Sequence, residues 1–425
     1  MLSINKSLIA MQNNHTFLFS AHNYAFLKLL AFRIQIVLAY QMTAVAVGWH
    51  IYEITHDPLA LGLIGLAEVI PYFCTALFAG HAVDHHYSRR KFALLAATML
   101  LLNALTLTAI SMDFVGDSLG SHASVWIYGS IAFTGVARAF IAPSYNTLFS
   151  IILPRENYAK ASGMSAAVFQ TGLVLGPALG GMLVGFANKT TAYSIAALLC
   201  LGAAVAMYLL NIKEPSKPVS TPVFASIAQG LRFVFNNQII LGAMSLDMFA
   251  VLFGGAVAML PAFIQDVYHL GPEGLGFLRA APALGAIAIA LWLSRHPINL
   301  HAGRWLLAAV AAFGLCIIGF AVTVHFWIAG LLLLVSGVFD GISVVLRTTI
   351  LQLTTPDDMR GRVSAINGIF IGSSNELGAF ESGLAARLIG LVPSVIFGGL
   401  MTLSVVGITA KYAPKLRNLE LSQLH

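Results

Sequence analysis

Charged residues lie inside long apolar segments of this chain, where they could carry protons or bind a polar solute. A charge in hydrocarbon is costly, so such residues are either paired or functional. The following fall well inside an apolar segment: Arg33, Glu68, Arg138, Asp247, Asp340, Arg347, Glu376 and Glu381. A carboxylate that is alternately buried and exposed, or alternately paired with and separated from an arginine, takes up and releases a proton. Such chemistry would couple proton movement to another event.

Glu68 is the first candidate for this coupling, because Arg33 and Arg138 lie at a similar depth in their own segments. All three are about 9 to 12 residues from the same membrane edge, roughly 14–18 Å at 1.5 Å per helical residue. Asp247 and Asp340 could act in the same way in the second half of the chain. For each of them the alternative is a static ion pair that holds helices together.

Glu376 and Glu381 are five positions apart on one helical segment, so they point to different faces. We expect only one of them to meet the interior of the bundle. Arg347 is interpreted as an anchor near a membrane edge.

Other kinds of active site have no counterpart in the sequence. It has no glycine-rich phosphate loop ending in Lys-Ser or Lys-Thr, and no Gly-x-Ser-x-Gly nucleophile motif. The histidine clusters 81–86 and 50–56 lack the companion ligands and spacing of a metal site. We therefore expect no enzymatic activity, no cofactor and no bound metal.

The composition indicates an integral membrane protein. Charged residues make up 9% of the chain and hydrophobic residues 58%, with a mean hydropathy of +0.84. An ordinary soluble domain is about 25% charged. The net charge of +6 does not indicate a nucleic-acid partner, because the basic residues lie in short loops between apolar stretches. The three cysteines lie in apolar segments, so a disulfide framework is not expected.

Twelve stretches are long and apolar enough to cross a bilayer, which takes about 20 residues. The predicted spans are 24–52, 59–80, 92–112, 124–150, 161–187, 191–211, 238–265, 274–293, 305–324, 326–350, 363–389 and 393–412. The fold class is therefore all-α, and the even count puts both termini on one side.

The distribution of positive charge predicts which side that is. Most of the 23 Lys and Arg residues fall in the termini and in the connections on the same side as the termini. Because cytoplasmic loops carry an excess of Lys and Arg, both termini are predicted to be cytoplasmic in a bacterial inner membrane. The polar N-terminus lacks the pattern of a cleaved signal peptide.

A polar, proline-containing segment divides the spans into two groups of six, as expected of transporters built from repeats. Its three prolines predict a semi-extended linker. The predicted organisation is a tail at 1–23, a six-helix half at 24–211, a cytoplasmic linker at 212–237, a second six-helix half at 238–412 and a tail at 413–425.

Two motifs have unusual residue spacing. The loop after the second span places Asp84 four residues after Gly80 and then carries Arg89 and Arg90. The fifth span contains a glycine-proline pattern that would break a soluble helix but permits close packing in a membrane. Its residues are Gly172, Gly176, Pro177, Gly180 and Gly181. We expect this pattern to supply a closely packed helix at the interface between the two halves.

These motifs, the twelve spans and the central linker resemble the major facilitator superfamily over essentially the whole chain. The run Asn375-Glu-Leu-Gly378 in the eleventh span resembles its branch of drug and siderophore exporters, which includes the enterobactin exporter. The resemblance implies that helices one, four, seven and ten line a central cavity and that Asp84 takes part in a conformational gate. It also implies that the glycine-proline motif marks an exporter. His85 stands where the loop pattern usually has arginine.

The sequence therefore predicts a secondary active exporter, coupled to protons by antiport, of a small siderophore-like or amphipathic metabolite. Multidrug efflux and uptake of a siderophore or nutrient by the same fold are the alternatives within the class. A transporter-shaped receptor that moves no solute is the alternative from another class. The expected partners are the solute, protons and membrane lipids, and the expected state is a monomer.

Overall fold

The computed structural model describes most of the chain. The described residues are 21–85, 88–112, 120–154, 157–212, 223–296, 298, 300–356 and 359–421. Within these ranges the regular structure is helical, and no strand occurs. The all-α class predicted from composition is confirmed.

The N-terminal half contains six long helices joined by short connections. They are α2 (Ala21–Thr55), α3 (Pro58–His85), α4 (Arg89–Ile110), α6 (Ala123–Ile152), α7 (Tyr158–Phe186) and α8 (Lys189–Tyr208), with a short turn η1 (Gly120–His122) before α6. Polar side chains mark some of the ends: Asn188 accepts a hydrogen bond from the backbone N–H of Thr191 at the start of α8. Lys28 and Arg90 donate to the carbonyls of Leu209 and Leu210 at its end.

The C-terminal half repeats this plan with one interruption. Its elements are α10 (Gln238–Phe253), η3 (Gly255–Val257), α11 (Leu260–Ala262), η4 (Phe263–Val267), α12 (Pro272–Arg295), α13 (Ala302–Val322), α14 (Phe326–Thr354), α15 (Arg360–Ile389), α16 (Leu391–Tyr412) and α17 (Pro414–Arg417). The span predicted as one helix over 238–265 is broken at Gly254 and ends in a π-helical turn. Gly254 packs its Cα against the ring of Phe313, where a Cβ would lie only 2.9 Å away, which fits a glycine at the break.

Eleven of the described helices or helix runs are long and apolar enough to cross a membrane. The twelfth is α15, which has 30 residues and therefore sufficient length. It is less apolar because it contains Asn375, Glu376 and Glu381. These polar residues lie on a helix packed between the two halves, where they need not face lipid.

The segment that connects the halves contains a helix that the sequence reasoning missed. Residues 212–237 were expected to be extended, but α9 (Val223–Asn236) occupies the second part of this segment. Its Val234 is fully buried, and its Gly230 lies against Arg362 and Ile366 of α15. The prolines that suggested an extended linker, Pro215, Pro218 and Pro222, lie outside the described residues.

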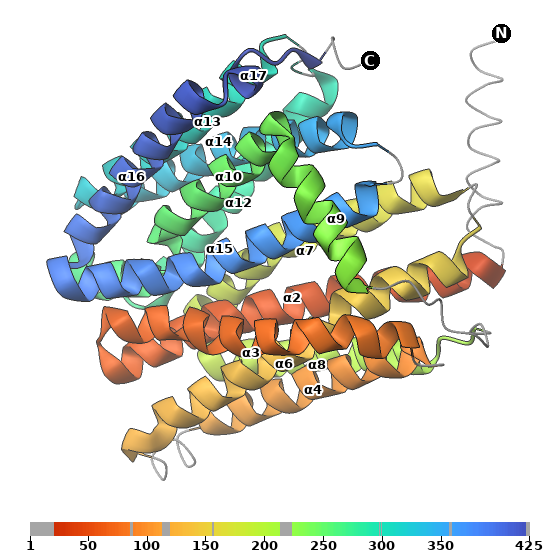
Figure 1. The fold of residues 1–425 in the computed structure, drawn as a ribbon. Coiled ribbons are helices and arrows are strands. Elements are labelled where there is room, and N and C mark those ends of the chain that lie inside the picture. The colour runs from red at the N-terminus through yellow and green to blue at the C-terminus, as the bar shows by residue number, and fades with distance from the viewer. Residues whose placement is uncertain are drawn as a thin grey trace, which may run out of the picture.

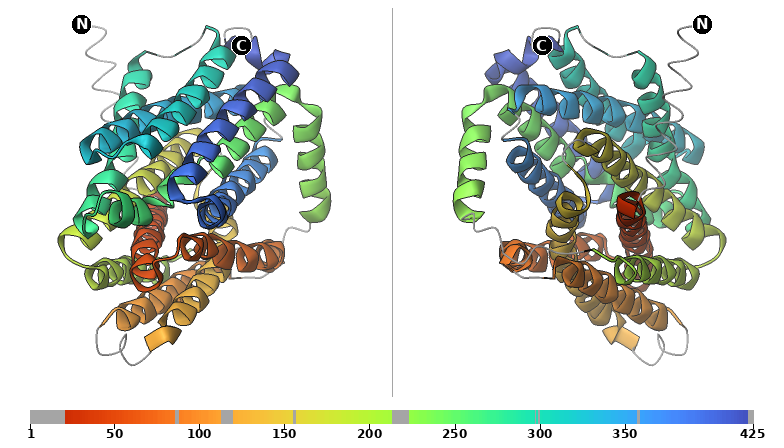
Figure 2. Two further views of the ribbon diagram at one scale, coloured as in Figure 1. Left: turned by 90° about the vertical axis from the view of Figure 1, so that its left-hand side faces the viewer. Right: turned by 90° about the vertical axis from the view of Figure 1, so that its right-hand side faces the viewer.

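The two halves meet along two long seams, α3 against α15 and α7 against α12 (Figure 1). Helix α9 runs along the outside of the bundle from the C-terminal half towards the N-terminal half (Figure 2). We call the end of the bundle at which α6 and α8 end the linker end. The end that contains the connections 56–57 and 268–271 is called the opposite end.

Candidate functional site

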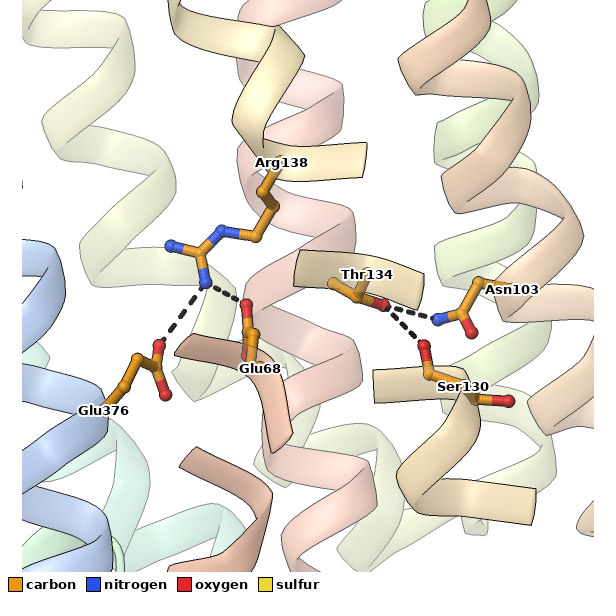
Figure 3. A network of polar contacts seen from close by, with 6 residues as sticks. All are labelled: Glu68, Asn103, Ser130, Thr134, Arg138 and Glu376. Carbon is orange, nitrogen blue, oxygen red and sulfur yellow. Dashed lines mark hydrogen bonds and ion pairs between the residues drawn. The ribbon is translucent and has the colours of Figure 1, made fainter. Parts of the chain in front are cut away.

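A cluster of three charges joins the two halves inside the bundle (Figure 3). Arg138 on α6 forms an ion pair with Glu68 on α3, and its Nη1 also lies 3.4 Å from Oε1 of Glu376 on α15. Glu68 is 6% exposed. The side chains of Arg138 and Glu376 are about one fifth exposed. One arginine is thus shared by a carboxylate of its own half and a carboxylate of the other.

Aromatic rings and glycines shape the surroundings of this cluster. The Arg138 guanidinium stands 4.5 Å from the ring centre of Tyr40 and 5.8 Å from that of Tyr72, within the range of cation–π attraction. A Cβ on Gly135 would clash with the backbone carbonyl of Glu68, and one on Gly65 with that of Glu376. These glycines were not singled out from the sequence, yet they allow α3 to approach α6 and α15 closely enough for the charges to meet.

A neutral polar network lies one helical turn away (Figure 3). Asn103 on α4 donates to Oγ1 of Thr134 at 2.8 Å, and the Thr134 hydroxyl donates to the carbonyl of Ser130 at 3.2 Å. All three residues are buried. The network links α6 to α4, and the ion pair with Glu68 links α6 to α3. The helix that carries Arg138 is therefore held by both of these neighbours.

Arg33 does not belong to this cluster, contrary to the expectation drawn from depth alone. Its guanidinium donates to Oγ of Ser165 at 2.8 Å and stacks over the rings of Tyr145 and Phe169 at 4.2 and 4.7 Å. No ion pair between Arg33 and Glu68 exists in the described part of the chain. Equal depth placed the two residues at one level, but the helical face on which Arg33 lies directs it towards α7.

Asp247 and Arg347 form an ion pair between α10 and α14 in the C-terminal half. Both residues are buried, with exposures of 8% and 5%. Arg347 is therefore part of a buried pair, whereas the sequence suggested a lone anchor. The pair has the burial expected of either a static link or a coupling site.

Asp340 has a different environment. It lies on α14 and is exposed, although it is in the middle of a membrane-crossing helix. It is nine residues from Leu331, an exposed side chain on the lipid-facing side, which places the two about 180° apart. Asp340 therefore faces the interior, and no ion pair to it is present among the described residues.

Helix α6 also has exposed residues on opposite sides of its axis. Ala142 is exposed and lies nine residues, about 180°, from the exposed Phe133, and Asn146 one turn later is exposed as well. The inner faces of α6 and α14 thus border solvent-accessible space between Arg138 and the linker end. On α7 and α15, a Cβ added to Gly163 or Gly368 would meet nothing within 4 Å. We infer from these exposed positions that the halves are apart on this side.

The opposite end is closed by contacts between the halves. Arg387 on α15 forms an ion pair of 2.8 Å with Asp57, which lies between α2 and α3. The Tyr52 hydroxyl donates to the carboxylate of Asp266 on η4. The structure is therefore open towards the linker end and closed at the opposite end.

The glycine-proline motif of α7 serves two interfaces. Gly172, Gly176 and Gly180 lie against Val37, Gln41 and Met42 of α2, within the same half. Gly181 alone among the motif glycines lies against α12, where an added Cβ would be 3.2 Å from the Cα of Gly276. Pro177 lies inside α7 without ending it. The motif was expected to pack at the interface between the halves, and most of it instead packs α7 on α2.

The loop motif can be described only in part. Gly80 and Asp84 fall in the last turns of α3, but their side chains lie outside the described part of the structure, as do the side chains of His81, His85 and His86. Arg89 is buried at the start of α4. Arg90 donates to the end of α8 at 2.6 Å, which gives it a capping contact. No group of three metal-ligating side chains occurs among the residues that the structure describes.

Arg279 was missed by the sequence reasoning. It lies on α12, inside a membrane-crossing segment, and its Nε is buried without a hydrogen-bond partner among the described residues. The criterion that found the other charges, a charged residue inside an apolar span, would also have found Arg279 in the span 274–293.

Two six-helix halves that meet along two seams and open at one end define a multi-pass membrane protein with the architecture of a secondary transporter. The chain belongs to the Major Facilitator Superfamily, whose family profile matches residues 30–379. It is therefore a membrane transporter by family.

Characterised relatives are similar over nearly the whole chain. The multidrug efflux pump Tap of Mycolicibacterium fortuitum is 24% identical, with 90% of this chain and 93% of the relative aligned. The enterobactin exporter EntS of Shigella flexneri is 26% identical, with 87% and 89% aligned.

Solved structures show the same fold at low sequence identity. A bacterial homologue of the human lysosomal transporter Spinster, in an inward-facing and unoccupied conformation, superposes with a TM-score of 0.68 at 13% identity and covers 93% of this chain and 96% of its own. A D-xylose-proton symporter gives 0.70 at 11% identity, covering 93% and 99%.

Proposed function

We propose that this transporter is a secondary active exporter that moves a small organic molecule, siderophore-like or an amphipathic metabolite, across the bacterial inner membrane in exchange for protons. The observation that carries the proposal is the sharing of Arg138 between Glu68 of its own half and Glu376 of the other half. An ion pair that crosses between moving bodies is made in one state and broken in another.

The coupling follows from this geometry. When the halves rock so that the linker end closes and the opposite end opens, α15 moves relative to α6, while α3 and α6 stay together within one half. Glu376 then loses its cation, and a carboxylate separated from its cation in a weakly polar surrounding tends to bind a proton. Return to the present state restores the contact with Arg138 and releases the proton. Asp340, exposed on the inner face of α14, is a second carboxylate that could take part.

The direction of transport is supported by two observations. The glycine-proline motif resembles that of exporters, and two relatives aligned over most of the chain are named as a drug pump and a siderophore exporter. The basic loops lie at the linker end, so by the positive-inside rule both termini and the open side face the cytoplasm. The opening would then admit solute from the cytoplasm.

Export is tested first by untargeted mass spectrometry of cells and spent medium, with and without this protein, in iron-replete and iron-starved cultures. We expect a metabolite that is released by the wild type and retained by the deletion strain. Absence of any difference in both conditions would contradict export and favour uptake or a receptor that transports nothing.

Proton coupling is tested on the purified protein in liposomes that contain a pH-sensitive dye. Addition of the metabolite identified in the medium should change the internal pH in wild-type liposomes and not in liposomes with Glu376→Gln. Solute movement without any proton movement in the wild type would contradict antiport.

Multidrug efflux is the second candidate, favoured by the similarity to Tap. It predicts that expression in a pump-deficient host raises the inhibitory concentrations of several unrelated drugs. Export of one metabolite predicts little or no change for those drugs, so the two functions are distinguished in one susceptibility assay.

A further inference from the structure

Arg279 differs from the other arginines in the middle of the membrane-crossing helices. Arg138 and Arg347 each form an ion pair with a carboxylate, and Arg33 has a hydroxyl and two aromatic rings around its guanidinium. No hydrogen bond, ion pair or ring contact to Arg279 is present among the described residues, and its Nε is buried. An unneutralised cation at this depth is costly, and such residues mark sites for a polar ligand.

The position of Arg279 on α12 shows where it points. Phe277, Leu284 and Leu291 are exposed and lie along one face of this helix. Arg279 is two residues from Phe277 and five from Leu284, which places it about 140–160° from both around the helix axis. It therefore points away from this exposed face and towards the seam with α7.

Arg279 also lies at the seam between the halves. Its Cβ is 3.1 Å from the position that a Cβ would occupy on Gly181 of α7. Gly181 belongs to the glycine-proline motif of the N-terminal half, and the absence of a side chain there leaves room for the arginine. Rocking of the halves would change the surroundings of Arg279, so a ligand bound to it would have different affinities for the two conformations.

Asp340 limits the kind of ligand. Gly341, its neighbour on α14, lies against Ala286 of α12, which is seven residues beyond Arg279 towards the linker end. Seven residues correspond to about 10 Å along a helix. The interior of the C-terminal half thus carries a positive charge near the closed end and a negative charge nearer the opening. A solute with negative charges at both ends would be repelled by Asp340.

We propose that Arg279 binds a carboxylate at one end of the transported solute, and that the substrates of this transporter are therefore monoanionic, amphipathic organic acids. The planar guanidinium offers two parallel N–H donors that match the two oxygens of a carboxylate. The inference rests on the proposed transport function and adds the chemical class of its substrate.

The test compares two aromatic probes of the same shape, 2-naphthoate and the neutral 2-naphthamide, by the shift in Tm of the purified protein. We expect 2-naphthoate to raise the Tm of the wild type and 2-naphthamide to have a much smaller effect. Arg279→Gln should weaken 2-naphthoate binding by about tenfold, as for loss of a charge-assisted hydrogen-bonded pair, whereas Arg279→Lys should retain part of it. Arg295→Gln, an exposed arginine at the linker end of the same helix, is the matched control and should bind normally.

A folding defect does not obscure the result. Removal of an unneutralised buried cation should leave the Tm without ligand unchanged or raise it, so Arg279→Gln is expected to be well folded. Equal responses to both probes, no response of the wild type to millimolar 2-naphthoate, or unchanged 2-naphthoate binding in Arg279→Gln would each overturn the proposal. Glu376→Gln separates it from the proposed function: that variant should lose pH-driven flux and keep 2-naphthoate binding. Proton-coupled export of neutral or cationic metabolites alone would leave the transport function standing and refute this inference.

Discussion

Arg138 on α6 lies 3.4 Å from Glu376 on α15, so an ion pair crosses between the two halves deep inside the bundle. The other ion pair that joins the halves among the described residues, Asp57–Arg387, lies at the opposite end. Towards the linker end the inner faces of α6 and α14 are exposed, and a Cβ added to Gly163 or Gly368 would meet nothing within 4 Å. Among the described residues, the central pair is therefore the ion pair between the halves that lies deeper in the bundle, and we expect opening of the opposite end to lengthen it.

Glu376→Gln should abolish coupling with little loss of stability. The contact is long and the Glu376 side chain is 23% exposed, so its removal should cost about 1 kcal/mol or less. Flux driven by a pH gradient in liposomes should fall about tenfold or more, because the proton site is lost. Downhill solute exchange without a pH gradient serves as the control and should persist. Full pH-driven flux in this variant would exclude Glu376 as the coupling residue.

Glu68→Gln should affect both transport and stability. Glu68 is buried and paired with Arg138 within one half, so loss of its charge leaves the longer contact to Glu376 as the remaining ion pair of the arginine among the described residues. Breaking a buried pair costs about 3–5 kcal/mol, and the amide, which can still accept a hydrogen bond, should reduce that cost. We expect an inserted protein with a Tm lowered by several degrees and with impaired flux. Wild-type flux from this variant would contradict a role for Glu68 in coupling.

The all-α architecture and the membrane-crossing helices could be predicted from the sequence. A segment that lies in lipid must be long and apolar whichever helices pack beside it. The sequence also brought Glu68 and Arg138 to one depth, and the structure pairs them. Depth does not determine rotation about a helix axis, so the same argument placed Arg33 wrongly. Gly65 and Gly135, which let the helices carrying the charges approach, look like ordinary glycines until the neighbouring backbone is known.

The prediction for the segment that connects the halves was wrong for a different reason. Its prolines predict an extended chain, but α9 begins directly after the last of them and is stabilised by burial of Val234 beside α10 and α15. A short amphipathic helix gains most of its stability from such packing, which the local sequence does not reveal.

Two glycines of α7 should respond oppositely to the same substitution. In Gly185→Ala, the new Cβ would lie 2.7 Å from the Cα of Glu273 and would force α7 and α12 apart at the opposite end. Overpacking of this kind costs about 1–3 kcal/mol. Gly163→Ala places its Cβ in open space, and the gain in helix propensity of up to about 1 kcal/mol should leave stability unchanged or raised. Thermal denaturation of the two purified variants tests this, and equal Tm values would contradict tight packing at the closed end.

The Asp57–Arg387 pair should bias the equilibrium between conformations. Both side chains are partly exposed, so the pair contributes about 0.2–1 kcal/mol to closure of the opposite end. Arg387→Gln should therefore increase the population open at that end by about 1.4- to 5-fold. Spin labels at Asn188 and Leu270, with Cys74 replaced by Ser, report the separation of the halves. The double swap Asp57→Arg with Arg387→Asp should restore the wild-type distances, and a population unchanged in Arg387→Gln would exclude a gating contribution.

The Asp247–Arg347 pair can be assigned a static or a coupling role by comparing single and double substitutions. Both residues are buried, so Asp247→Leu alone leaves an uncompensated arginine and should destabilise the protein by about 3–5 kcal/mol. Adding Arg347→Met removes the second charge, and replacement of a whole buried pair by apolar residues is often neutral or stabilising. We expect the double variant to recover the wild-type Tm. If it also recovers pH-driven flux, the pair only holds α10 to α14 and proton coupling depends on the cluster around Arg138. If the Tm returns while flux does not, Asp247 takes part in coupling, and a mechanism based on Glu68 and Glu376 alone is insufficient.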